Sequence, residues 1–101
     1  MTNRKWLLNA RPKALEAINE LPRKDALAVF DSIEKLLSAD NPVAVAGVKK
    51  VKGRDGVWRQ RRGNYRIFFG LDSTPVTEGD QSYKGTLIVA DVSKRDESTY
   101  R

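Results

Sequence analysis

Apolar residues recur at helical spacing in the first part of the chain. Leu15, Ile18 and Leu21 lie three residues apart behind Pro12, whose missing N–H suits the first turn of a helix. Pro22 follows this pattern directly and favours a stop. The spacing therefore predicts a first helix between the two prolines.

A second helix with a clearer period is predicted after Pro22. It ends near residues 38–40, because the Asn41-Pro42 dipeptide breaks helices. Its expected apolar face consists of Ala26, Val29, Phe30, Ile33, Leu36 and Leu37. The link between the two helices is short enough to form an αα-hairpin. In front of them, residues 5–8 form a short apolar-leaning run that predicts an edge strand.

Strand patterns flank a turn in the second half of the chain. Residues 57–62 and 65–71 are rich in aromatic and branched side chains. Between them stands Gly63-Asn64, and a two-residue turn with glycine first is typical of a β-hairpin. The sequence therefore predicts two antiparallel strands joined at this turn.

A third strand pattern, at residues 86–92, is a nearly continuous apolar run, as expected for a strand that lies centrally in a sheet. Residues 42–56 are expected to form a loop and residues 71–85 a polar connection. The order of the elements predicts one α+β domain over residues 1–101. In it, a short N-terminal strand precedes an α-helical hairpin, which packs on one face of a mostly antiparallel sheet of three to four strands.

The turn determines which side chains of the hairpin share a face. Arg61 lies opposite Arg66 and Arg59 opposite Phe68, and directly paired residues project to the same side of a sheet. This face is cationic, with one aromatic ring that can stack on a nucleobase. Two arginines placed opposite each other repel, so the arrangement becomes favourable when a phosphate or carboxylate bridges them. The other face can pack on the helices and carries Trp58, Gln60, Arg62, Tyr65, Ile67 and Phe69.

Positive charge is concentrated in the same region. Residues 49–66 contain eight basic residues and one acidic residue, so this stretch carries +7 in a chain whose total charge is +6. A concentrated cationic block is the electrostatic footprint of a nucleic-acid partner. The residues expected to contact an RNA backbone are Lys49, Lys50, Lys52 and Arg54.

The composition excludes several kinds of chemistry. The chain has no cysteine and no histidine, so a zinc centre and a Ser/His or Cys/His nucleophile pair are not expected, nor is any cofactor. The apolar run near the N-terminus covers only residues 6–8, too short for an export signal. No run of about 18 apolar residues exists. We therefore expect a cytoplasmic protein without a membrane partner.

Five segments carry a family likeness, and they run in order through most of the chain. They are residues 48–53, residues 57–61, the hairpin segment Gly63-Asn64-Tyr65-Arg66-Ile67-Phe68-Phe69, residues 91–95, and the pair Tyr100-Arg101. Together with the helical hairpin in front, they resemble the RelE/ParE superfamily of bacterial toxins, the toxic halves of type II toxin–antitoxin pairs. The Gly-x-Tyr-Arg-hydrophobic hairpin is the most recognisable piece.

The resemblance implies a fold, a target and a partner. The fold has two helices against an antiparallel sheet, which agrees with the pattern above. The RelE-like branch, favoured here, cleaves mRNA in the A site of the ribosome. Its partners would then be the 70S ribosome with its mRNA, and a cognate antitoxin protein that wraps the toxin surface.

The resemblance also implies site residues. RelE-like nucleases have basic residues on the second strand, which correspond here to Arg59 and Arg61. They have an arginine after the hairpin tyrosine and another after the last strand, which correspond to Arg66 and Arg95. Their tyrosine near the C-terminus corresponds to Tyr100. The family commonly has lysines where Arg59 and Arg61 stand. The departure matters because lysine can lose a proton when its pKa is lowered, whereas arginine cannot.

A cleavage mechanism without histidine follows as a hypothesis. Attack by the RNA 2′-OH requires stabilisation of the charge on the phosphorane and proton transfers to and from oxygen. Arg61 and Arg66 would hold the phosphate and the transition-state charge. Arg95 would stabilise the leaving side, and Lys94 or Tyr100 would be the titratable group, its pKa lowered by neighbouring cations.

Three alternatives stay open at this point. A ParE-like protein inhibits DNA gyrase and needs a protein-binding surface without arranged cations, which the arginine cluster disfavours. A non-catalytic RNA-binding member of the superfamily would fit the replaced lysines. The arginines can also be merely solvated side chains on an exposed sheet.

Overall fold

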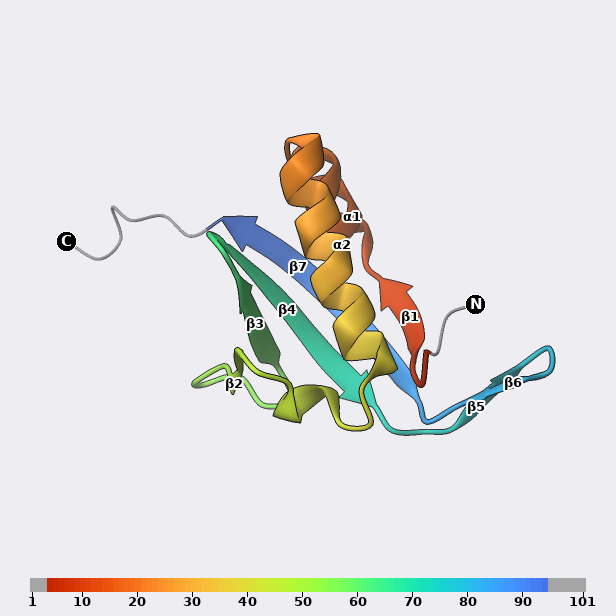
Figure 1. The fold of residues 1–101 in the computed structure, drawn as a ribbon. Coiled ribbons are helices and arrows are strands. Elements are labelled where there is room, and N and C mark those ends of the chain that lie inside the picture. Colours follow the sequence, from red (N-terminus) through yellow and green to blue (C-terminus); the bar gives the residue numbers. More distant parts are fainter. Residues whose placement is uncertain (1–3, 95–101) are drawn as a thin grey trace.

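The computed structural model describes residues 4–94 and forms one α+β unit (Figure 1). In chain order its elements are β1 (Leu7–Ala10), α1 (Pro12–Asn19), α2 (Arg23–Ser38), the 3-10 turn η1 (Pro42–Ala44), β2 (Val48–Lys50), β3 (Trp58–Arg62), β4 (Tyr65–Asp72), β5 (Val76–Glu78), β6 (Gln81–Tyr83) and β7 (Thr86–Lys94). Both helices, the hairpin and the last strand are confirmed. The N-terminal strand begins two residues later than expected.

The main sheet has the strand order β1-β7-β4-β3-β2, in which, within residues 4–94, only β1 and β7 run parallel. The expected central position of the last strand is confirmed, since β7 lies between β1 and β4. The expected number of three to four strands is wrong, because the described sheet has five.

Two segments assigned to loops contain short strands. β2 lies within residues 42–56 and pairs with β3, and β5 and β6 pair with each other within residues 71–85. Each of these strands has three residues, too few to show an alternating pattern. They form because tight turns bring them onto a partner: Gly53, Gly56 and Gly79 adopt the left-handed conformation at these turns.

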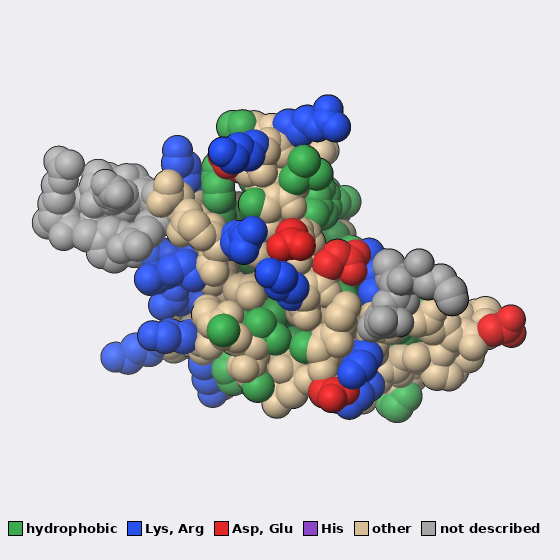
Figure 2. All heavy atoms as spheres, viewed as in Figure 1, with side chains coloured by type: hydrophobic (Ala, Val, Ile, Leu, Met, Phe, Trp, Pro, Cys, Tyr) green, Lys and Arg blue, Asp and Glu red, His purple; other side chains and the backbone are tan. Residues whose placement is uncertain are grey.

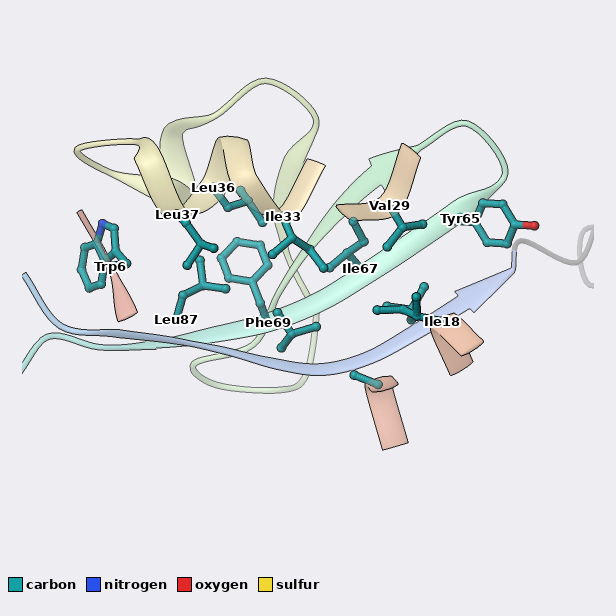
Figure 3. Close-up of a cluster of buried hydrophobic side chains, with 13 residues drawn as sticks. Trp6, Ile18, Val29, Ile33, Leu36, Leu37, Tyr65, Ile67, Phe69 and Leu87 are labelled. Carbon is teal, nitrogen blue, oxygen red and sulfur yellow. The ribbon is translucent and has the colours of Figure 1, made fainter. Parts of the chain in front are cut away.

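Both helices cover the same face of the sheet. Their buried side chains join those of β4 and β7 in one core, shown in part in Figure 3. Trp6 closes one end of it and donates its indole N–H to the carbonyl of Ala39 at 3.0 Å. The fully buried large side chains include Leu36, Leu37, Ile67, Phe69 and Leu87.

The apolar face of α2 is narrower than its periodicity suggests. Val29 and Ile33 are buried, and Ser32 is only 2% exposed, but Phe30 is 44% exposed. Successive residues of a helix are rotated by about 100°, so Phe30 turns away from the line through Val29 and Ile33. Leu15 of α1 is exposed for the same reason. The prediction that Phe30 shares one face with Val29 and Ile33 is therefore wrong for the buried face of α2.

The pairing of β4 with β7 contains a β-bulge. Phe68 pairs with Asp91, whereas the next residue, Phe69, pairs with Val89. Ala90 is therefore an extra residue in β7. The bulge reverses the alternation of the strand, so that Val89 and Val92 are buried in the core and Asp91 projects to the opposite face.

Candidate nucleic-acid interface

The register of the hairpin is the one expected from the Gly63-Asn64 turn. Arg61 pairs with Arg66 and Arg59 with Phe68. On the helix-covered face, Gln60, Tyr65, Ile67 and Phe69 are buried. The arginines and Phe68 therefore project from the other face, which no described helix covers. We call this surface the open face and define it by Lys49, Arg59, Arg61, Arg66, Phe68 and Asp91.

Lys49 extends the row of cations across the sheet. It pairs with Arg59 in the edge strand β2, so the two side chains lie next to each other on the open face. Figure 2, which looks at the helix-covered side, shows Lys and Arg side chains gathered along the edge where β2 and β3 lie. The positive charge of residues 49–66 is thus collected at one end of the sheet.

The cations surround a small hollow of about 110 Å³ lined by Gly47, Lys49, Arg59 and Arg61. Within residues 4–94, no carboxylate lies within ion-pair distance of Arg59 or Arg61. Cationic side chains that converge without a protein anion repel one another, and an anion between them removes the repulsion. The geometry suits an oxyanion such as a phosphate.

Helix α2 holds the turn end of the hairpin from behind. The hydroxyl of Tyr65 donates to the carboxylate of Asp25 at 2.7 Å. This hydrogen bond, together with desolvation and the nearby negative charge, raises the pKa of Tyr65. Arg62, which faces the helices as expected, lies 3.7 Å from the carboxylate of Asp31. Both contacts lie on the helix-covered side of the hairpin, opposite Arg59, Arg61 and Arg66.

The remaining candidate residues are not all on the open face. Lys50 pairs with Trp58, and Lys94 pairs with Tyr65, so both project to the helix-covered side. The register therefore does not place Lys94 beside the arginine cluster, which corrects the expectation that it acts there. Lys52 is an exposed turn residue, and Arg54 lies at the rim of a second hollow. Arg95 and Tyr100 lie outside the described residues.

This second, larger hollow was not predictable from the sequence pattern. It measures about 420 Å³ and is lined by Lys13, Arg54, Val57, Phe68, Ala90 and Asp91. Asp91 places a carboxylate on the otherwise cationic open face, 3.4 Å from the ammonium group of Lys13. An acidic residue in a buried apolar run was the available signal. The face to which the Asp91 side chain projects, however, depends on the bulge at Ala90, and the sequence pattern does not indicate this bulge.

Two further features were sought among residues 4–94: a cluster of metal ligands and a membrane-spanning helix. No group of three or more acidic, histidine or cysteine side chains gathers among residues 4–94. Neither helix in this part of the chain is long and apolar enough to cross a lipid bilayer.

Comparison with known proteins gives a consistent result for the fold. No protein-family model and no curated protein matches the sequence. Among solved structures, the toxin–antitoxin complex RelBE2 from Mycobacterium tuberculosis matches with a TM-score of 0.68 and 21% identity, over 91% of this chain and 93% of the other. A RelB–RelE complex from Methanococcus jannaschii matches with a TM-score of 0.62 and 23% identity, over 91% and 94%.

The isolated RelE toxin of E. coli gives a TM-score of 0.70 at 14% identity and covers 94% of this chain and 89% of its own. The match extends over nearly the whole of each chain, so the likeness concerns the complete domain. This chain therefore has the fold of the RelE toxins.

Proposed function

We propose that this protein is the toxin of a type II toxin–antitoxin pair and acts as a ribosome-dependent endoribonuclease on mRNA in the A site. The observation that carries the proposal is the open face, where Arg59, Arg61 and Arg66 project together from a RelE fold. A protein that only inhibits gyrase has no need for such converging cations.

The chemistry proposed for this face is phosphate binding and charge stabilisation. The 2′-oxygen of the RNA attacks the adjacent phosphorus, the bond from phosphorus to the 5′-oxygen breaks, and the products are a 2′,3′-cyclic phosphate and a 5′-hydroxyl. The phosphorane between these states carries an additional negative charge. Arg61 and Arg66, on neighbouring strands, stabilise that charge in the transition state.

The proton transfers are assigned outside the cationic cluster. Arginine keeps its proton, so Arg59 and Arg61 do not replace a lysine that acts as a base. Arg95 on the leaving side and Tyr100 as the titratable group remain predictions from the resemblance. Because the arginine cluster itself offers no ordinary base, we expect the ribosome to supply much of the alignment of the mRNA, and free RNA to stay intact.

A protein antitoxin is the partner that fits best. The M. tuberculosis and M. jannaschii structures with this fold are complexes of a toxin with an antitoxin. A segment that neutralises this protein would have to cover the open face, and its acidic side chains would match the cations there.

The test is a purified translation reaction in which mRNA 5′ ends are mapped by primer extension, with naked mRNA in parallel. We expect cuts at A-site codons in the translating sample alone. Intact mRNA in both samples would reject the nuclease, and a DNA supercoiling assay with gyrase would then test the remaining toxin activity.

A further inference from the structure

The larger hollow on the open face carries features that phosphate binding does not use. It lies beside the arginine cluster and combines the ring of Phe68 with the carboxylate of Asp91. A carboxylate repels phosphates, so it does not strengthen the binding of an RNA backbone. It accepts hydrogen bonds and donates none when ionised, so its natural ligand is a group with N–H donors.

The fold directs this carboxylate to the open face at some cost. Aspartate is disfavoured in strands, and only the extra residue Ala90 turns Asp91 away from the core. Its ion pair with Lys13, at 3.4 Å, involves a lysine side chain that is 78% exposed, and such pairs contribute little stability. Stability therefore does not account for the placement.

The carboxylate is held in a fixed orientation. One of its oxygens, Oδ1, accepts the backbone N–H of Val92 at 2.8 Å, and the other, Oδ2, faces Lys13. Each carboxylate oxygen has two acceptor positions, so both oxygens can accept a further hydrogen bond. The side chain is 28% exposed and therefore accessible from solvent.

The hollow has the size and the lining of a site for a nucleobase. Its volume of about 420 Å³ lies within the range of roughly 300–1,000 Å³ usual for small-molecule sites. Phe68 lies directly opposite Asp91 in the β4–β7 pairing and offers a ring on which a base can stack. Arg54 lines the same hollow and supplies a cation for the flanking backbone.

The distance to the arginine cluster fits a single nucleotide. Phe68 follows Arg66 by two residues on the same face of β4, a separation of about 7 Å along a strand. A nucleotide whose phosphate lies at Arg61 and Arg66 can therefore place a base in the hollow.

We propose that Phe68 and Asp91 form a pocket that selects guanine. Guanine presents two adjacent donors, N1–H and the N2 amino group, which match the two oxygens of a carboxylate as a guanidinium does. Adenine and cytosine offer one amino donor on the corresponding edge, and uracil offers one ring N–H. The inference rests on the proposed function, because that function makes RNA the ligand. It adds that the protein recognises guanine in that RNA.

Binding of mononucleotides tests the pocket without the ribosome. The probes are guanosine, inosine and adenosine 5′-monophosphates, followed by NMR chemical shifts of the backbone amides. Inosine lacks only the N2 amino group, so the comparison isolates one donor. We expect guanosine monophosphate to bind about tenfold more tightly than inosine monophosphate, with shifts at Phe68, Ala90 and Asp91.

Two variants separate base reading from stacking. Asp91→Asn keeps the shape but loses an acceptor, and should bring the guanosine-to-inosine affinity ratio close to one. Phe68→Leu should weaken all three nucleotides and leave that ratio in place, because it removes the ring and keeps the carboxylate. Equal binding of the two purine probes by the wild-type protein, no shift in the pocket, or an unchanged ratio in Asp91→Asn would overturn the proposal.

Cleavage in a translation reaction gives the second test, on a message whose codons differ only in one base. We expect cuts at guanine-containing codons to exceed the others about tenfold, and this ratio to disappear in Asp91→Asn. If Asp91→Asn instead lowers cleavage equally at every codon and leaves the ratio between codons unchanged, Asp91 does not recognise the base. It would then take part in the cleavage reaction itself. If the wild-type protein cuts no message, the proposed function fails, and the nucleotide experiment still decides the pocket.

Discussion

Arg61 and Arg62 are adjacent in β3 and carry the same charge, yet they face opposite sides of the sheet. Arg61 pairs with Arg66 on the open face, whereas Arg62 lies 3.7 Å from Asp31 of α2. The alternation of a β-strand thus places one arginine on the proposed phosphate-binding face and the next one beside α2. This alternation was predictable from the turn at Gly63-Asn64, because the turn sets the register.

The adjacent pair provides a matched comparison. We expect Arg61→Ala to slow mRNA cleavage in a translation reaction about 100-fold, because a donor aimed at the developing charge is lost. Arg62→Ala removes the same charge from the other face and should change the rate less than about threefold. Equal losses in the two variants would show that only the total charge matters.

We expect the stability of the fold to depend on alkaline pH through Tyr65. Its hydroxyl donates to Asp25, and the hydrogen bond raises the pKa of the phenol. A raised pKa in the folded state means that the stabilisation is complete below the unfolded value of about 10 and is lost as pH rises through the folded value. The wild type should therefore unfold at higher denaturant concentration than Tyr65→Phe at pH 7–9.

The same comparison above pH 10 provides the control. There the difference between wild type and Tyr65→Phe should shrink, because the unfolded phenol ionises first. A difference that stays constant up to pH 11 would show that the Asp25 hydrogen bond does not stabilise the folded state.

At the scale of elements, long periodic segments were predictable and short ones were not. Helices α1 and α2, the hairpin of β3 and β4, and β7 each have enough residues to reveal a period. β2, β5 and β6 have three residues each and depend on partners that sequence periodicity does not reveal. The bulge at Ala90 was equally hidden, and with it the direction of Asp91.

The junction between β6 and β7 depends on a glycine that packs closely. A Cβ atom on Gly85 would lie 2.0 Å from the carbonyl oxygen of Asp72 and 2.8 Å from the ring of Trp6. We expect Gly85→Ala to lower the free energy of unfolding by about 1–3 kcal/mol, as overpacking does in other cores.

Denaturant unfolding of the variant measures this cost. Ser82→Ala, at an exposed position of β6, should leave the unfolding midpoint unchanged. A Gly85→Ala variant as stable as the wild type would mean that Asp72 and Trp6 can move apart without penalty.

At the scale of the molecule, charge is distributed unevenly. The cationic strands β2 and β3 lie at one end of the sheet, while the β5–β6 hairpin extends from another part of it and carries Glu78 and Asp80 at its tip (Figures 1 and 2). Such a distribution orients the protein toward a polyanion as it approaches.

RNA binding should therefore depend strongly on salt. The four cations of the open face are Lys49, Arg59, Arg61 and Arg66. If they bind phosphates, the logarithm of the affinity for single-stranded RNA should fall with the logarithm of salt with a slope of about −3. Arg61→Ala should make the slope shallower by about 0.7, as measured by fluorescence anisotropy. A slope near zero would contradict backbone binding.

We propose that the open face of this protein cleaves mRNA on the ribosome. The most direct measurement is the mapping of mRNA 5′ ends in a translation reaction with the wild-type protein, Arg66→Ala and Arg62→Ala side by side. We expect A-site cuts with the wild type and Arg62→Ala, none with Arg66→Ala, and none on naked mRNA. Cleavage that persists in a folded Arg66→Ala variant, or intact mRNA with the wild type, would contradict the claim.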